Sequence, residues 1–156
     1  MRILGIDPGT SRMGWGVVES GGGVLSSSGY GLIDSSKIRD ITDKIRHIST
    51  QVTLLIREFE PEAVAVEEPF YARNANVLLR IGQASGAVMA AALLLEKQVA
   101  VYSVLEIKQA VVGYGKADKK QVQEMVKILL KMDRIPSPAD SADALAAAIC
   151  HHNIIR

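Results

Sequence analysis

The hydrophobic pattern divides the chain into a first part that favours strands and a later part in which helices and strands alternate. Apolar runs bounded by turn residues predict strands over residues 2–6, 15–18 and 24–33. The glycine tract at 21–23 separates the second strand from the third. Because tight turns join neighbouring antiparallel strands, these three segments are expected to form an antiparallel meander.

The pattern changes to a helical one after the third strand. Apolar residues recur every three or four positions from Ile38 to Leu55, which predicts an amphipathic helix that ends before Pro61. The short apolar run at 63–66 predicts a strand, and residues 74–97 have a helical pattern. Small residues on one face of that helix let another backbone approach closely, so this face is expected to pack on the sheet or on a partner chain: Gly82, Gly86 and Ala90.

A further short buried strand is expected over 99–104, and two apolar stripes then predict two more helices. The first stripe is formed by Val122, Met125, Val126 and Leu129, and the second by Ala142, Leu145, Ala146 and Ile149. The order β-β-β-α-β-α-β-α-α adds parallel strands to the meander. The sequence therefore predicts an α/β fold with a five-stranded mixed sheet flanked by helices.

Length and composition indicate a single soluble domain over residues 1–156. The chain is 48% hydrophobic and 22% charged, which is typical of a globular protein. The N-terminus has no pattern of a signal peptide, and the longest apolar stretch, 84–95, is too short to span a membrane. A single cysteine, Cys150, precludes an internal disulfide and fits a reducing, cytoplasmic location. Cys150 is expected in the core, and His151 and His152 in a frayed terminus.

Carboxylates stand at three separate places where an α/β fold could bring them together. Asp7 follows the first strand, Glu67 ends the strand at 63–66, and Asp140 and Asp143 lie one turn apart at the start of the last helix. Each has an ordinary explanation as well: Asp-Pro-Gly forms turns, Glu67 and Glu68 could be solvated, and acids in a first helical turn complement the helix dipole. No single one of these signals is specific.

The conjunction of the four acids has a chemical rationale. Acids that lie close together repel one another unless a cation lies between them, and hard oxygen ligands suit magnesium or manganese. Two divalent ions about 3.5–4 Å apart can activate a water on one side of a phosphodiester and stabilise the leaving oxygen on the other. The sequence thus predicts a phosphoryl-transfer site with two Mg²⁺ ions, for which Mn²⁺ is an alternative.

Basic residues are concentrated in one segment of a chain whose net charge is only +1. Residues 106–134 contain seven basic and four acidic residues, a net charge of +3. This asymmetry is what a phosphate-binding surface requires, although Lys127 and Lys131 equally fit a solvated helix face.

Several stretches along nearly the whole chain resemble the RuvC family of Holliday-junction resolvases. They are ILGIDPGT at 3–10, VEEPF at 66–70 with ARNA at 72–75, GQASG at 82–86, KQAVVG at 108–113, KQVQ at 120–123 with MV at 125–126, and ADSADALA at 139–146. Together these motifs are highly specific, whereas the Asp-x-Gly start is shared by ribonuclease H-like proteins in general. The family's metal-binding acids match Asp7, Glu67, Asp140 and Asp143 by position. The family motif selects Glu67 over Glu68, and Pro69 is a departure from its pattern.

The resemblance implies a ribonuclease H-like fold, a homodimer, and magnesium-dependent paired nicking of opposed strands in a four-way DNA junction. It also implies docking to the branch-migration complex of RuvA and RuvB. Phe70 matches an aromatic residue that stacks on a base, and lysines match the DNA-contacting positions less closely: Lys108, Lys116, Lys119 and Lys120. Among these, Lys119 is expected nearest the catalytic acids, with Lys120 as its rival.

Three other functions stay open at this point. A nucleotide-binding phosphotransferase of the actin and sugar-kinase type also begins with a strand that ends in Asp-x-Gly-Thr, but it normally needs two such domains. A nuclease related to the pre-ribosomal RNA processing proteins would use the same basic segment on RNA. A non-catalytic junction-binding dimer would not need the complete set of four acids.

Overall fold

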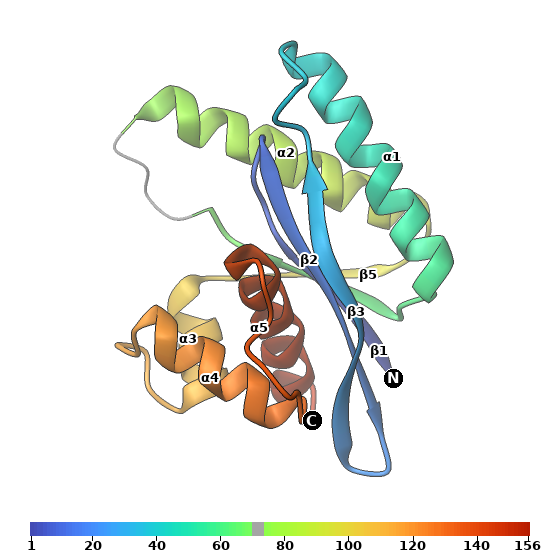
Figure 1. The fold of residues 1–156 in the computed structure, drawn as a ribbon. Coiled ribbons are helices and arrows are strands. Elements are labelled where there is room, and N and C mark those ends of the chain that lie inside the picture. The colour runs from blue at the N-terminus through green and yellow to red at the C-terminus, as the bar shows by residue number, and fades with distance from the viewer. Residues whose placement is uncertain (70–73) are drawn as a thin grey trace.

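The computed structural model describes residues 1–69 and 74–156, and a five-stranded mixed sheet lies at its centre (Figure 1). The strand order is β3-β2-β1-β4-β5. β1 pairs antiparallel with β2 and parallel with β4, as the sequence predicts. The strands are β1 (Arg2–Asp7), β2 (Arg12–Gly21), β3 (Val24–Asp34), β4 (Ala63–Glu67) and β5 (Gln98–Tyr102).

Helices cover both faces of the sheet (Figure 1). On one face, α1 and α2 pack against each other and enclose Leu4, Ile6 and Val64 of the central strands. On the other face, α5 lies across β1 and β2, and α3 and α4 pack against α5. The helices are α1 (Ile41–Phe59), α2 (Ala75–Leu94), α3 (Val104–Val112), α4 (Lys119–Leu129) and α5 (Ala139–Ile154).

The region around β5 differs from its prediction in two ways. The strand ends at Tyr102, and residues 104–112 form the helix α3, which the sequence pattern did not reveal. A capping box starts this helix, since the Ser103 hydroxyl accepts from the Glu106 N–H while the Glu106 carboxylate accepts from the Ser103 N–H. The strand is also not buried, because β5 is an edge of the sheet and Val101 is 45% exposed.

Glycines in the central strands let α5 lie directly on the sheet. A Cβ at Gly5 would lie 1.9 Å from the carbonyl oxygen of Ala144, and one at Gly14 would lie 2.0 Å from that of Asp140. Both distances are far below van der Waals contact with backbone atoms, which cannot move aside cheaply. The small residues of β1, β2 and α5 therefore fix the start of α5 against the ends of the strands.

The expectation of a frayed terminus at His151 and His152 is wrong. Both residues lie within α5 and are about 95% buried, and Tyr102 Oη and His151 Nδ1 are hydrogen-bonded at 2.7 Å. Burial is the main cause that lowers the pKa of both histidines. Cys150 is fully buried, so its prediction as a core residue is confirmed.

The small-residue face of α2 does not pack on the sheet. The buried positions of α2 include Ala84, Val88 and Ala92, whereas a Cβ at Gly82 or Gly86 would meet nothing within 4 Å. Among the described helices, α2 is the one with the length and hydropathy of a membrane span, with a mean hydropathy of 1.6 over 18 residues. Its contacts with α1, β4 and β5 are those of a helix that covers a sheet.

Candidate active site

Two of the four candidate acids end neighbouring parallel strands. Asp7 is the last residue of β1 and Glu67 the last residue of β4, and the register pairs Ile6 with Val66 immediately before them. Because parallel strands end at the same edge of a sheet, the two carboxylates lie on the same side of the molecule.

The other two acids come from the first turns of α5. One carboxylate oxygen from each of Asp7, Asp140 and Asp143 lies within 4.8 Å of the others. Glu67 is outside that group but lines a cavity of about 200 Å³ together with Asp143. The fold thus brings together acids that are separated by up to 136 positions in the sequence.

The electrostatics of this cluster favour a bound cation. Burial, followed by the negative charges of Glu67, Asp143 and Asp140, raises the pKa of Asp7 to about 8. Burial is also the largest cause that raises the pKa of Glu67 to about 7, and the charge of Asp143 adds to it. A divalent cation would offset both the burial and the mutual repulsion of these acids. Partly buried carboxylate oxygens are the donor set that Mg²⁺ or Mn²⁺ prefers.

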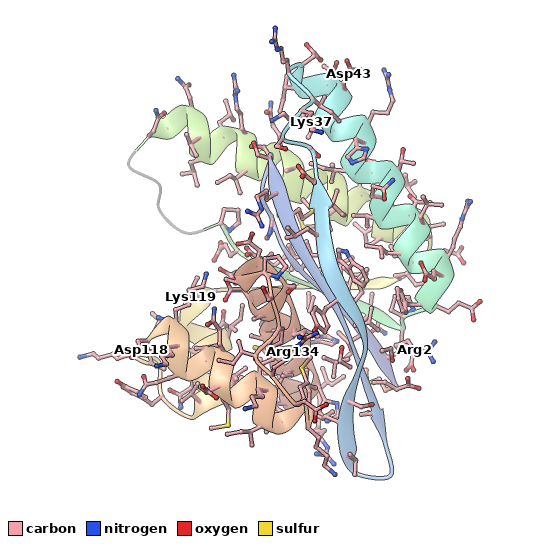
Figure 2. All side chains as sticks on the ribbon, viewed as in Figure 1. Arg2, Lys37, Asp43, Asp118, Lys119 and Arg134 are labelled. Carbon is pink, nitrogen blue, oxygen red and sulfur yellow. The ribbon has the colours of Figure 1, made fainter. Side chains whose placement is uncertain are left out.

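The predicted lysines differ in their relation to the acids. Lys119 Nζ donates to Asp143 Oδ2 at 2.7 Å, and this hydrogen bond is the main cause that raises the pKa of Lys119. Figure 2 shows Lys119 on α4, close to the start of α5. Lys108 lines the same cavity as Glu67. Lys120 lines a different groove on α4, and Lys116 is exposed in the segment before that helix. Phe70 lies outside the described residues.

Arg12 is a site residue that the sequence reasoning missed. Its Nε lies 3.8 Å from Asp140 Oδ2, and its side chain is 55% exposed. Arg12 is the first residue of β2 and follows the Asp-Pro-Gly turn, so the sequence could have shown that it lies close to Asp7 along the chain. The sequence could not show its contact with Asp140, which lies 128 positions later.

A central sheet of this order, with acids at the ends of β1 and β4 and at the start of a helix that crosses it, defines a nuclease of the ribonuclease H-like class. The profile of the family described as "Crossover junction endodeoxyribonuclease RuvC" matches residues 3–151. The chain therefore belongs to the RuvC family of crossover junction endodeoxyribonucleases.

Individual relatives agree with this assignment. The chain is 44% identical to a crossover junction endodeoxyribonuclease RuvC of Alkaliphilus metalliredigens, covering 97% of this chain and 92% of the relative. It is 46% identical to that of Rubrobacter xylanophilus, covering 96% and 83%. Among solved structures, Thermus thermophilus RuvC in complex with a Holliday junction substrate is 35% identical and superposes with a TM-score of 0.94 over 100% of this chain and 95% of that one. These likenesses favour a nuclease over the phosphotransferase alternative.

Proposed function

We propose that Asp7, Glu67, Asp140 and Asp143 hold divalent metal ions with which the protein cuts strands of a four-way DNA junction. The observation that carries this proposal is the convergence of acids from β1 and α5 in one partly buried cluster, beside which Glu67 of β4 lines a cavity together with Asp143. The likeness to a RuvC structure that contains a Holliday junction substrate supports the choice of DNA. The reaction would take place in the cytoplasm during recombination and repair.

The metal is proposed to be Mg²⁺, with two ions in each site and Mn²⁺ as an alternative. When bound, such ions supply an activated water and stabilise the charge on the leaving oxygen of the phosphodiester. The role of the chain is to hold the ions with carboxylates whose positions are set by the sheet and by α5. Lys119, whose ammonium already lies on Asp143, would contact the scissile strand beside the acids.

The basic segment of residues 106–134, which includes most of α3 and all of α4, is proposed to bind the phosphates near the cut. Lys108 and Lys119 line the cavity that contains Glu67 and Asp143, so they would lie nearest to the scissile phosphate. Lys116 and Lys120 are exposed on the same part of the molecule and would contact phosphates further along the DNA. Phe70 is proposed to stack on a base, a contact typically worth about 1–3 kcal/mol.

Two nicks on one junction require two sites, so we propose that the protein acts as a homodimer. The exposed face of α2 is the surface that best fits such a contact, because its apolar residues and glycines have no partner within the described chain. The residues of this α2 face are Leu79, Gly82, Gly86, Ala90 and Leu93. Docking to RuvA and RuvB is proposed from the family resemblance.

The test is cleavage of a labelled four-way DNA junction with magnesium and with a chelator. A linear duplex and a structured RNA serve as control substrates. We expect magnesium-dependent nicks at opposed positions of the junction and none on the duplex. Cleavage that prefers the RNA, or junction cleavage that persists in the chelator, would contradict the proposal.

The matched variant is Asp7→Asn, which removes one ligand charge and leaves the basic surface in place. We expect it to bind the junction like the wild type and to lose cleavage. Nicking at the wild-type rate would show that the acid cluster is not the active site.

A further inference from the structure

We propose that Arg12, Lys37 and Lys44 form a second group of phosphate-binding residues beside the acids, here called the rim. The rim lies on the side where α1 meets the sheet, and it holds the scissile strand there. Lys119 and Lys108 approach the same acids from α4 and α3. The inference rests on the proposed function, because it assigns how the DNA strand lies across the proposed site. In Figure 2, Lys37 lies beyond the ends of β2 and β3 on the α1 side, and Lys119 lies on α4.

A tight turn fixes the position of Arg12. A Cβ at Gly9 would lie 2.1 Å from the carbonyl oxygen of Arg12, so only glycine lets the chain between β1 and β2 close this sharply. Arg12 then begins β2 with its Nε 3.8 Å from Asp140 Oδ2, which is longer than a hydrogen bond. Such an exposed ion pair adds little to stability. The guanidinium therefore keeps donors available for phosphate oxygens, which it can bind in a bidentate manner.

Hydrogen bonds connect Lys44 to the same turn. The Ser35 N–H donates to the carbonyl oxygen of Ser11 at 2.8 Å, which ties the segment after β3 to the turn before β2. Lys44 Nζ, from the first turns of α1, donates to Ser11 Oγ at 3.3 Å. A lysine whose partner is a neutral hydroxyl keeps its full charge available to an anion.

Lys37 adds a third charge beside Arg12. Hydrogen bonds from Ser36 are the main cause that lowers the pKa of Asp34, and the charges of Arg12 and Lys37 lower it further. Both cations thus act on the same acid, which faces Arg12 across β2 and β3. Within residues 1–69 and 74–156, no carboxylate lies within 4.0 Å of the ammonium group of Lys37 or Lys44.

The acids at the centre make such a rim necessary. A strand that is cut at the acids carries phosphates on both sides of the scissile one, and the uncompensated carboxylates repel all of them. Lys108 and Lys119 reach the strand from α3 and α4 only. Arg12, Lys37 and Lys44 provide three positive charges toward the remaining side, and the exposed acids of the same segment of the chain are Asp34, Asp40 and Asp43.

The experiment measures junction binding by fluorescence anisotropy in a chelator, across a series of salt concentrations. The test protein is the double variant Arg12→Gln, Lys44→Gln. The matched control is Arg57→Gln, Lys97→Gln, which removes two charges near the opposite end of the sheet, at the end of α1 and before β5. Thermal unfolding verifies that each variant is folded, and cleavage is measured for the wild type and the control.

We expect the slope of log affinity against log salt to fall by about 2 in the double variant, one for each lost phosphate contact. The fall in affinity between about 50 and 200 mM salt should become roughly tenfold smaller than in the wild type, and the control should match the wild type. A purely structural role would change the unfolding temperature and leave the salt slope intact.

Two results would overturn the inference. Wild-type slope and affinity in the double variant would show that the strand does not reach this rim, and an equal loss in the control would show that only net charge matters. The single variant Lys44→Gln covers the case in which loss of Arg12 disturbs Asp140, because within residues 1–69 and 74–156 Lys44 forms no ion pair with an acid. A wild-type protein that neither binds nor cuts the junction would instead contradict the proposed function.

Discussion

Asp7 shows how a residue that reads as part of a turn becomes the centre of a site. In the sequence it precedes Pro8 and Gly9, a combination that turn chemistry explains by itself. In the folded chain it is partly buried, and carboxylate oxygens of Asp140 and Asp143 lie within 4.8 Å. Burying like charges together costs stability, so this arrangement is one that a fold keeps for a purpose other than stability.

We therefore predict that Asp7→Asn stabilises the protein when no divalent metal is present. The amide keeps the shape of the carboxyl group and needs no proton, whereas Asp7, whose pKa is raised to about 8, must take up a proton from neutral solution in order to fold without a metal. The unfolding temperature in a chelator at neutral pH should rise by several degrees, and magnesium should raise it in the wild type more than in the variant. The control is Asp133→Asn, an exposed acid away from the cluster. Equal unfolding temperatures of wild type and Asp7→Asn would contradict the prediction.

At the scale of elements, α5 determines the geometry of the site. It is rich in alanine, and it supplies two of the acids from its first turns. It can approach the sheet because Gly5 and Gly14 present no side chain toward it. The apolar stripe predicted the helix, but its close contact with the strands depends on glycines more than 120 positions away in the sequence.

We predict that Gly14→Ala impairs cleavage by moving α5. The new Cβ would meet the backbone oxygen of Asp140 at 2.0 Å, so the helix must shift away from β2. Overpacking of this kind costs about 1–3 kcal/mol, and the shift would displace the acid that Gly14 contacts. Denaturant unfolding and junction cleavage measure the two effects. Gly21→Ala, where a Cβ meets nothing within 4 Å, should behave like the wild type, and an equally active Gly14→Ala would contradict the prediction.

The histidines at the end of α5 predict a loss of stability in acid. Burial holds the pKa of His151 and His152 below the ordinary value of 6.5, so the unfolded chain takes up protons that the folded protein does not. The stability that the neutral histidines provide is present above about pH 6.5 and is lost as the pH falls below it. The free energy of unfolding should therefore fall more steeply with decreasing pH in the wild type than in His151→Gln, His152→Gln. Parallel curves for the two proteins would show that these histidines are not the cause.

At the scale of the whole molecule, the two layers of helices have different roles. The α3–α4–α5 layer carries the acids of α5 and the basic segment, whereas the α1–α2 layer leaves the α2 face uncovered. Leu79 and Leu93 on this face are 62% and 60% exposed. An exposed apolar face of this kind marks a contact surface, and a dimer through α2 would keep the acids of both chains free.

We predict that Leu79→Asp converts a dimer into a monomer. A charge placed within an apolar contact surface would remain unpaired and buried, which strongly disfavours association. Light scattering should give the mass of two chains for the wild type and of one for the variant, and the variant should lose paired nicks on the junction. Ile128→Asp, at a 63% exposed position on α4, is the matched control. A variant that keeps the wild-type mass would place the dimer surface elsewhere.

The sequence by itself determined most of the elements that form and which residues are candidates for the chemistry, because strand and helix periodicity and turn residues are local properties. The five strands, four of the five helices and the four candidate acids follow from it. The helix α3 was missed because it has only nine residues and begins directly after the edge strand, so that its first residue, Val104, was included in the predicted strand.

Only the tertiary structure decided how these parts meet. The contact of Arg12 with Asp140, the choice of Lys119 over Lys120 as the neighbour of Asp143, and the burial of His151 depend on packing between segments far apart in the chain. The two lysines are adjacent in the sequence and leave α4 in different directions, and the position of α5 decides which of them meets Asp143. Distances and burial of this kind arise from the whole fold, so no local pattern of residues can contain them.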